Sequence, residues 1–268
     1  MKATIIGAGN LGGAIARGLA KGTFLKAEEI TCVDPNPSAL ERLASLGLPF
    51  NTTRDLKKSL VGADIIILAV KEQAVPSVLE DARGAIDPRR QLLFSTVAGL
   101  SIDALEEMTA RVCGDDTRPV LFRVMPNIAV SVGESMTFIS SLNANADQTK
   151  LAERIFGEMG RTMVIPERLM PAAMAVASCG LAYAMRYVRA AMNGAVEAGF
   201  SAAEAHDVVL QTVKGAVDLL ARGEHPEAEI DRVTSPGGYT IRGLNAMEEK
   251  GFSSAVVAGI RESYKNSR

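Results

Sequence analysis

The chain has 268 residues, of which 47% are hydrophobic and 22% charged, so it can bury a sizeable core and is not expected to be disordered. Its formal net charge is -2, and no cluster of Lys and Arg alternates with aromatic residues. Nucleic acids and anionic membranes are therefore poor candidate partners.

Cysteines are few and widely spaced, at Cys32, Cys113 and Cys179. An odd, sparse set of this kind makes neither a disulfide framework nor a CxxC metal clip, and it fits a reducing cytoplasm. The first residues enter an apolar strand at once, without the longer apolar region of a secretion signal. The uncharged stretch Leu169–Met185 is short for a membrane span and favours a buried helix. We expect a soluble, cytoplasmic protein.

Up to residue 166, short β-like runs alternate with helical patterns. The predicted strands are Ala3–Ile6, Ile30–Val33, Asp64–Val70, Gln91–Ser95, Val120–Val124, Ser135–Ile139 and Thr162–Ile165. The predicted helices include Leu11–Lys21, Ser38–Leu46, Ala74–Ala82 and Ala146–Met159. The apolar run Ile65–Leu68 is typical of a strand buried on both faces of a mainly parallel sheet. Residues 1–166 are therefore expected to form a doubly wound, Rossmann-type α/β domain.

Residues 167–268 show helical periodicity, many alanines and no convincing strand. The predicted helices are Met170–Ala198 with a break near Gly180, Ala202–Ala221, Tyr239–Lys250 and Ser253–Asn266. A segment of about 100 residues makes only a small core. We therefore expect an all-helical domain that binds substrate and forms a dimer with a second copy, the alternative being that it packs on its own first domain.

The segment from Gly7 through Gly9, Asn10 and Leu11 to Gly12 fits GxGxxG, directly after a predicted strand and at the start of a predicted helix. In this motif the first glycine makes a tight turn, the second lets the backbone approach a pyrophosphate, and the third allows close packing of helix and strand. The helix N-terminus then offers free N–H groups to the phosphates. The motif in this context predicts a dinucleotide site.

Asp34 ends the second predicted strand, roughly 20 residues later, where this fingerprint has an acidic residue. Its carboxylate can accept hydrogen bonds from the ribose hydroxyls of NAD, whereas it would repel the 2′-phosphate of NADP by roughly 4 kcal/mol at about 4 Å and an effective dielectric near 20. The following residues 35–38 contain no arginine to offset this. We predict that NADH is preferred over NADPH, the alternative being that Asp34 only caps the next turn.

A second glycine-rich turn, Ser235-Pro236-Gly237-Gly238, runs into the helix predicted from Tyr239. Adjacent glycines let successive N–H groups converge, and Ser235 and Thr240 add hydroxyl donors, so the turn suits a carboxylate. Several hydrogen bonds to a charged group, at roughly 1.5–3 kcal/mol each, could hold a small anion. An ordinary turn with a helix cap is the alternative.

This turn, with Thr240 and then Gly243-Leu244 after it, resembles the signature of pyrroline-5-carboxylate reductases. Weaker matches to the family follow in the same order along nearly the whole chain. They are Gly7–Gly12 with Gly18-Leu19, Ala69-Val70-Lys71, Ser95–Gly99, Arg123–Asn127 and Gln211–Val213.

The resemblance implies reduction of 1-pyrroline-5-carboxylate to L-proline, in proline biosynthesis, with hydride from a nicotinamide cofactor. It places the substrate carboxylate on the loop Ser235–Thr240, which includes Gly237, Gly238 and Tyr239, and makes Ser235 and Thr240 the catalytic hydroxyls. Thr240 would orient the ring nitrogen or relay its proton. The implied nicotinamide wall comprises Ala69, Val70, Lys71, Ala98 with Gly99, and Met125 to Asn127, although Lys71 can also be a solvated loop lysine. In the family the pocket involves a dimer partner, so a homodimer or a higher oligomer built from dimers is expected.

Several alternatives remain open. The only histidines, His206 and His225, have no cysteines at ligand spacing, so no metal is expected. β-Hydroxyacid dehydrogenases resemble this domain order but carry a catalytic lysine early in the long helix, and Met170–Val188 has none. Tyr239 replaces a residue that is usually small in the signature, and residues 177–181 and 128–129 also depart from the family pattern. These departures leave room for a divergent paralogue acting on another cyclic imine, or for a non-enzymatic NAD(H)-binding regulatory protein.

Overall fold

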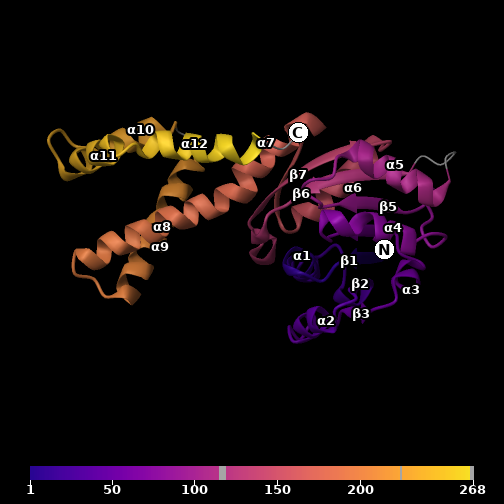
Figure 1. Cartoon of the computed structure of the whole chain (residues 1–268). Helices are drawn as coiled ribbons and strands as arrows, with labels where there is room; N and C mark the ends of the chain where they lie inside the picture. Colours follow the sequence, from indigo (N-terminus) through magenta and orange to yellow (C-terminus); the bar gives the residue numbers. More distant parts are fainter. Residues whose placement is uncertain (115–118, 224, 266–268) are drawn as a thin grey trace. The chain divides into compact units, whose positions relative to one another are not determined.

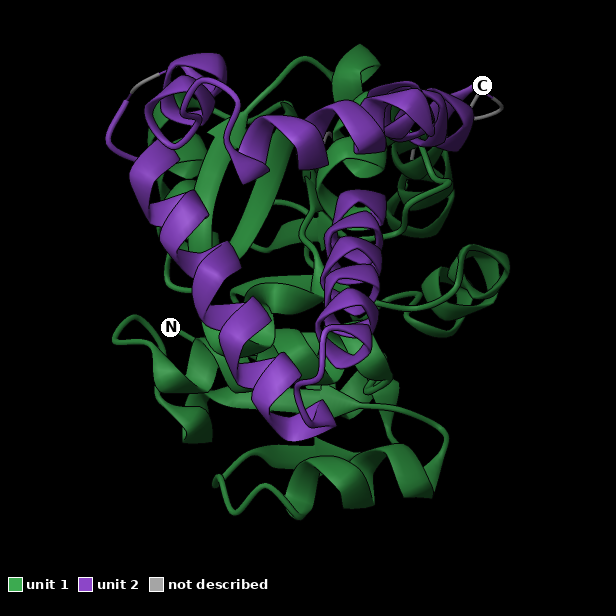
Figure 2. Cartoon of the chain, turned by 90° about the vertical axis from the view of Figure 1, so that its left-hand side faces the viewer, with its two compact units in different colours: residues 1–178 green, residues 179–268 purple. Residues whose placement is uncertain are grey.

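A computed structural model of the chain divides into two compact units, residues 1–178 and residues 179–268 (Figure 2). It describes residues 1–114, 119–223 and 225–265. The division falls near the end of a π-helical segment, Met174–Cys179, twelve residues after the boundary expected at 166. Met170, Ala173 and Ala175 in the intervening stretch are buried. The first turns of the helical region therefore contribute to the core of unit 1.

Unit 1 contains, among its described residues, an eight-stranded sheet in the order β3-β2-β1-β4-β5-β6-β7-β8 (Figure 1). The strands are β1 (Ala3–Ile6), β2 (Ile30–Val33), β3 (Asn51–Thr53), β4 (Ile65–Leu68), β5 (Leu92–Ser95), β6 (Val120–Met125), β7 (Ser135–Leu142) and β8 (Gly160–Val164). Neighbours from β3 to β6 run parallel, and β7 runs antiparallel to β6. All four side chains of β4 are buried, as expected for a strand covered on both faces.

Helices cover both faces of this sheet. On one face lie α1 (Asn10–Lys21), α2 (Pro37–Ala44) and α6 (Ala146–Gly157), whose apolar side chains join one core cluster. On the other lie α3 (Leu56–Leu60), α4 (Val75–Asp81) and α5 (Ile102–Cys113), which belong to a second cluster. This doubly wound arrangement confirms the Rossmann-type fold predicted from the sequence.

The sequence pattern missed β3, because Asn51–Thr53 is short and polar and lies at the sheet edge. It also ended β7 three residues early, since the outer part of that strand carries serines. Tertiary pairing rather than local hydrophobicity forms these segments.

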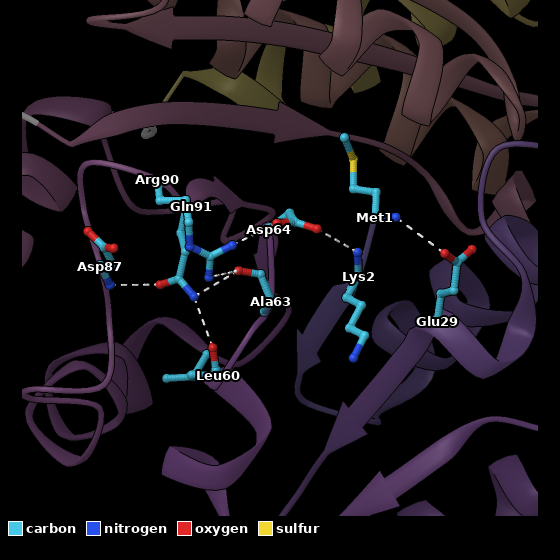
Figure 3. A network of polar contacts seen from close by, with 9 residues as sticks. All are labelled: Met1, Lys2, Glu29, Leu60, Ala63, Asp64, Asp87, Arg90 and Gln91. Atoms are coloured by element: carbon cyan, nitrogen blue, oxygen red, sulfur yellow. Dashed lines mark hydrogen bonds and ion pairs between the residues drawn. The ribbon is translucent and has the colours of Figure 1, made fainter.

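Polar contacts join the strands at the edge of the sheet where β1 and β4 begin (Figure 3). Asp64 accepts the Lys2 N–H at 2.8 Å and pairs with Arg90 at 2.7 Å, and Arg90 also donates to the Ala63 carbonyl at 2.7 Å. The buried Gln91 side chain donates to the Leu60 and Ala63 carbonyls. These contacts stabilise the amino-terminal ends of the strands, whereas Rossmann-type sheets bind ligands at the carboxyl ends.

Unit 2 is helical in its described residues. Its helices are α8 (Gly180–Glu197), α9 (Ala202–Leu220), α10 (Pro226–Arg232), α11 (Tyr239–Glu249) and α12 (Phe252–Tyr264). Helix α8 packs along α9, and α11 contacts α12. The last residue predicted for α12, Asn266, lies outside the described residues.

The prediction that Leu169–Met185 forms a buried helix is wrong for the isolated chain beyond Gly180. Helix α8 contains no buried residue, and Met185 is 60% exposed. Within the described residues, the helical stretch Glu167–Glu197 is long and apolar enough to cross a membrane by length and composition, with 17% of its most apolar window buried. Length and composition by themselves are weak evidence for a membrane span.

Candidate functional site

The loop after β1 is shaped by two glycines that admit no side chain. Gly7 has φ +101, and a Cβ built there would lie 2.5 Å from the Ala69 carbonyl oxygen. A Cβ on Gly12 would overlap the Gly7 carbonyl oxygen. By contrast, a Cβ on Gly9 would meet nothing within 4 Å, so this position faces open space. The loop is therefore tight against β4 and open at Gly9, which is the shape a pyrophosphate requires.

Helix α1 begins immediately after this loop, with Gly9 as its N-cap and no side-chain cap. The Gly13 N–H donates to the Gly9 carbonyl at 2.8 Å, which leaves the N–H groups of Asn10, Leu11 and Gly12 outside the helical ladder. Such a terminus attracts anions through its free N–H groups and its dipole. The loop and the helix start together fit a dinucleotide phosphate.

Asp34 lies next to this loop and uses its carboxylate for structure. Oδ2 accepts the Ala8 N–H at 2.7 Å, and Oδ1 accepts the Asn36 N–H at 2.8 Å. The turn contact considered from the sequence is therefore present. An ionised carboxylate has about four acceptor positions, so two remain for other donors. The Ala8 contact also holds the carboxylate beside the glycine loop.

A pocket of about 260 Å³ runs between α1 and α2 beside this loop. Gly9 and Asn10 line this pocket together with Arg17 and Arg42. Among the described residues, Arg17 Nε is buried without a hydrogen-bond partner. Neither arginine stands in a motif, but Arg17 follows Asn10 by two helical turns and so shares its face of α1.

The loops after β4 and β5 continue the same edge of the sheet. Thr96 donates its N–H to the Leu68 carbonyl at 2.9 Å, which joins the two strand ends. The Glu72 carboxylate packs against Gly99, so close that a Cβ there would overlap it. Lys71, Ala98 and Gly99 are exposed, and Ala69 and Val70 are half-buried. Through the contact of Gly7 with Ala69, these loops adjoin the glycine loop.

Asn127 is 7% exposed, and each end of its side-chain amide makes one hydrogen bond. Its Oδ1 accepts the Ala129 N–H at 3.0 Å and caps the 3₁₀ turn η3 (Ile128–Val132), while Nδ2 donates to the Ala177 carbonyl at 3.2 Å. Its side chain thus connects the end of β6 to the π-helical segment.

The second glycine turn, in unit 2, begins α11 as predicted. The Gly238 N–H donates to the Ser235 carbonyl at 3.0 Å, Gly237 has φ +67, and Gly238 is the N-cap without a side-chain cap. Tyr239 is 90% exposed, and the Arg242 guanidinium lies 5.5 Å from its ring centroid. The helix start therefore lacks a side-chain cap, and the Ser235 hydroxyl lies beside Gly238. Uncapped N–H groups at a helix start suit an anion such as a carboxylate.

Among the described residues, no group of three or more His, Cys, Asp and Glu side chains could hold a metal ion. His225 accepts the Glu227 N–H and caps α10, and His206 contacts its neighbour Asp207. All three cysteines are free thiols. Burial raises the pKa of Cys32 to about 12, which keeps this thiol protonated and unreactive.

The glycine loop, the helix α1 terminus and the doubly wound sheet define a dinucleotide-binding domain of the oxidoreductase type. In agreement, a family model described as "NADP oxidoreductase coenzyme F420-dependent" matches residues 2–99. A second, described as "Pyrroline-5-carboxylate reductase dimerisation", matches residues 167–268.

Relatives that match nearly the whole of this chain identify the family. Pyrroline-5-carboxylate reductase 2 of Dictyostelium discoideum is 35% identical over 96% of this chain and 88% of its own length. Pyrroline-5-carboxylate reductase 1 of the same organism is 34% identical over 96% of this chain, which spans 47% of that longer protein. The crystal structure of Plasmodium falciparum pyrroline carboxylate reductase with NADP bound superposes with a TM-score of 0.88 at 29% identity, covering 100% of this chain and 97% of that one. The chain belongs to the pyrroline-5-carboxylate reductase family, as its motifs predicted.

Proposed function

We propose that this protein reduces 1-pyrroline-5-carboxylate to L-proline with hydride from a nicotinamide dinucleotide. The observation that carries the proposal is similarity to pyrroline-5-carboxylate reductases over 96% of the chain in sequence and 100% in structure. The expected division of labour assigns residues 1–166 to the cofactor and residues 167–268 to substrate and dimerisation.

The chain's own residues bind and orient, because the cofactor supplies the hydride that adds to the C=N carbon. Free N–H groups at the start of α11, with the Ser235 hydroxyl, hold the substrate carboxylate. The Thr240 hydroxyl, in the first turn of the same helix, orients the ring nitrogen and relays the proton that this nitrogen gains. Gly237 and Gly238 keep the turn free of side chains that would cover these donors.

The remaining assignments concern the cofactor. Gly7, Gly9 and Gly12 with the N–H groups of Asn10 and Leu11 take the pyrophosphate. Asp34 takes the adenosine ribose with the acceptor positions that its two backbone contacts leave free. The nicotinamide wall comprises Ala69, Val70, Lys71, Ala98 and Asn127, the last through the backbone it shapes.

We further propose that NADH is preferred, because the Asp34 carboxylate repels a 2′-phosphate. Replacing Asp34 with Ser should then shift the ratio of kcat/KM for NADPH to that for NADH upward by at least about tenfold, a change of 1.4 kcal/mol. Steady-state rates with both cofactors measure this ratio. A wild-type preference for NADPH would contradict the proposal and point to Arg17 and Arg42, on the neighbouring pocket, as the groups that hold the phosphate.

The assembly is proposed to be a homodimer, or a higher oligomer built from dimers, in the cytoplasm. An apolar groove of about 930 Å³ lies between α8 and the α11–α12 pair, lined by Tyr183, Tyr187, Phe252, Val256 and Ile260. Large apolar side chains such as Val257 and Met185 are exposed on the same helices, and exposed apolar surface of this kind favours association. The match of this segment to a dimerisation model favours a second copy over a membrane.

One experiment tests the substrate. Cofactor absorbance is followed with 1-pyrroline-5-carboxylate, with a six-membered cyclic imino acid and with a β-hydroxyacid. We expect turnover with the first. Turnover with the six-membered imine alone would indicate a divergent paralogue, which the exposed Tyr239 beside the carboxylate turn favours as the second candidate. Cofactor binding without turnover would indicate a regulatory protein.

A further inference from the structure

Arg123 is a buried cation near the carboxyl ends of the parallel strands, where the cofactor is proposed to bind. It lies near the end of β6, paired in register with Ser95, the last residue of β5. Its side chain is 8% exposed. Alternation along the strand places it on the same face as Leu121, which belongs to the core cluster under α3, α4 and α5.

The guanidinium joins two segments that follow different strands. One terminal nitrogen donates to Glu167 Oε1 at 2.6 Å, and the other donates to the Ala98 carbonyl at 2.6 Å. Glu167 begins the 3₁₀ turn η4 (Glu167–Leu169), and its Oε1 also accepts the Ile102 N–H at 3.1 Å, in the first turn of α5. The loop between β5 and α5 is thus held at Ala98 by the arginine and at Ile102 by the glutamate.

This pair is poorly arranged for stability alone. Within the described residues, Arg123 Nε and Glu167 Oε2 are both buried and have no hydrogen-bond partner. A buried ion pair with unsatisfied atoms gains little over an apolar replacement, because desolvation offsets the attraction. The pair instead fixes orientation. Because the guanidinium is rigid and planar, its two donors hold the Ala98 carbonyl and the Glu167 carboxylate at a fixed position relative to each other.

The loop that it holds lies where a ligand is expected. In open α/β sheets ligands bind outside the carboxyl ends of the parallel strands. Ala98 and Gly99 follow the carboxyl end of β5 and are exposed, and the Glu72 carboxylate of the loop after β4 lies beside Gly99. A shift of Ala98 would therefore move backbone that the proposed function assigns to the nicotinamide wall.

We propose that Arg123, braced by Glu167, is a positioning residue that sets the Ala98–Gly99 backbone against the nicotinamide ring and so fixes the hydride-transfer distance. The inference rests on the proposed function for the identity of the ring. It predicts a defect in hydride transfer without a defect in cofactor binding, because the phosphates and ribose are held elsewhere, at Gly7–Gly12 and Asp34.

Three variants test this: Arg123→Met, Arg123→Lys and Glu167→Gln. Met removes both donors. Lys keeps the charge but replaces the fork by a single ammonium, which cannot hold both acceptors in the same directions. Gln keeps the shape and the oxygen acceptor but leaves the guanidinium charge uncompensated. We expect kcat to fall by about 100-fold in the Met and Lys variants, the effect of a misplacement near 1 Å, and by about tenfold in the Gln variant.

The deciding readout is the deuterium isotope effect on kcat with cofactor deuterated at the transferred position. It should rise toward its full value in the variants, because hydride transfer becomes rate-limiting, while the Kd of the cofactor changes less than about twofold. A purely structural role would lower the melting temperature and leave the isotope effect unchanged. If the Met variant does not fold, the Lys and Gln variants carry the test.

Arg90→Met is the matched control, because Arg90 also bridges a carboxylate and a carbonyl, those of Asp64 and Ala63, but at the opposite edge of the sheet (Figure 3). It should keep the wild-type isotope effect. A wild-type isotope effect in Arg123→Lys, or the same rise in Arg90→Met, would overturn the proposal. Fluorescence of bound NADH gives a reading that does not depend on turnover. A changed emission in Arg123→Lys at unchanged Kd supports the positioning role. A wild-type protein that reduces no imine would defeat the proposed function but not this result.

Discussion

The Asp34 carboxylate makes two contacts that hold the backbone, one with each oxygen. The spacing from the glycine loop predicts a ribose contact, and the local sequence predicts a turn cap. The structure shows the turn contact to Asn36 together with a second contact to Ala8 in the glycine loop. That second contact joins residues 26 positions apart and depends on β1 and β2 being neighbours in the sheet. The carboxylate is therefore oriented by the fold and not only by its own turn.

Thr240 is the residue whose loss should separate chemistry from binding. Thr240→Ala removes the hydroxyl that we propose orients the ring nitrogen, so we expect kcat to fall by about 100-fold, within the range for general acid–base groups. The Kd of the cofactor should stay within about twofold, because the glycine loop belongs to the other unit. Thr240→Ser, which keeps the hydroxyl, serves as the control. Unchanged turnover in the alanine variant would remove Thr240 from the mechanism.

At the scale of the element, the start of α1 has room for a side-chain methyl group at Gly13 but not at Gly12. Gly12→Ala places a Cβ against the Gly7 carbonyl, so we expect a loss of about 1–3 kcal/mol in the free energy of unfolding and at least about tenfold weaker cofactor binding. Gly13→Ala is the matched control. Its Cβ would meet the Leu43 side chain at 3.5 Å, an ordinary contact, and should stabilise the helix by about 0.5–1 kcal/mol. Denaturant titration and cofactor fluorescence measure both effects, and equal behaviour of the two variants would contradict this account.

The ends of α1 and α6 are joined through Glu158. Its carboxylate accepts the Thr23 hydroxyl at 2.9 Å, the Phe24 N–H at 3.0 Å and the Thr23 N–H. Partial burial raises the pKa of Glu158, but these hydrogen bonds outweigh it and hold the pKa below its usual value. A lowered pKa in the folded state means that ionised Glu158 stabilises the fold above its unfolded-state pKa, and that this stability is lost as pH falls through the folded-state pKa.

Glu158→Gln should therefore destabilise the protein by about 1 kcal/mol at pH 7, after allowance for solvent screening. The difference from wild-type should shrink as the pH is lowered below 4.5, the ordinary value for a glutamate, because the wild-type carboxyl is then protonated too. Melting temperatures measured from neutral to acidic pH check this. A difference that stays constant across the range would show that charge has no part in the contact.

At the scale of the whole molecule, the two units differ in how they bury apolar surface. Unit 1 encloses two clusters on the faces of its sheet, whereas α8, α11 and α12 contain no buried residue in the single chain. Small residues along α8 favour close helix contact, and the helices expose large apolar side chains. A second copy of the chain would cover them.

Met185→Glu should prevent this association. Met185 is 60% exposed on α8 and adjoins the groove residues Ala184 and Arg186. A carboxylate that the second copy buries there without a partner would cost several kcal/mol, which weakens dimerisation by at least about 100-fold. The molecular mass from sedimentation and the turnover rate, measured at the same protein concentration, should fall together. Val61→Glu, on a 78% exposed residue of unit 1, should leave the mass unchanged. A dimer that persists in Met185→Glu would place the interface elsewhere.

The amino-acid sequence by itself determined the features that depend on neighbours along the chain. These are the glycine turn before α1, the turn before α11, the apolar run of β4 and the helical character of unit 2, because φ preferences, helix starts and hydrophobic periodicity act over a few residues. Only the tertiary structure decided the contacts that join distant segments. Three features depend on which strands and helices become neighbours, and no local pattern encodes that. They are the hydrogen bonds of Arg123 to Ala98 and Glu167, the pocket lined by Arg17 and Arg42, and the exposure of α8.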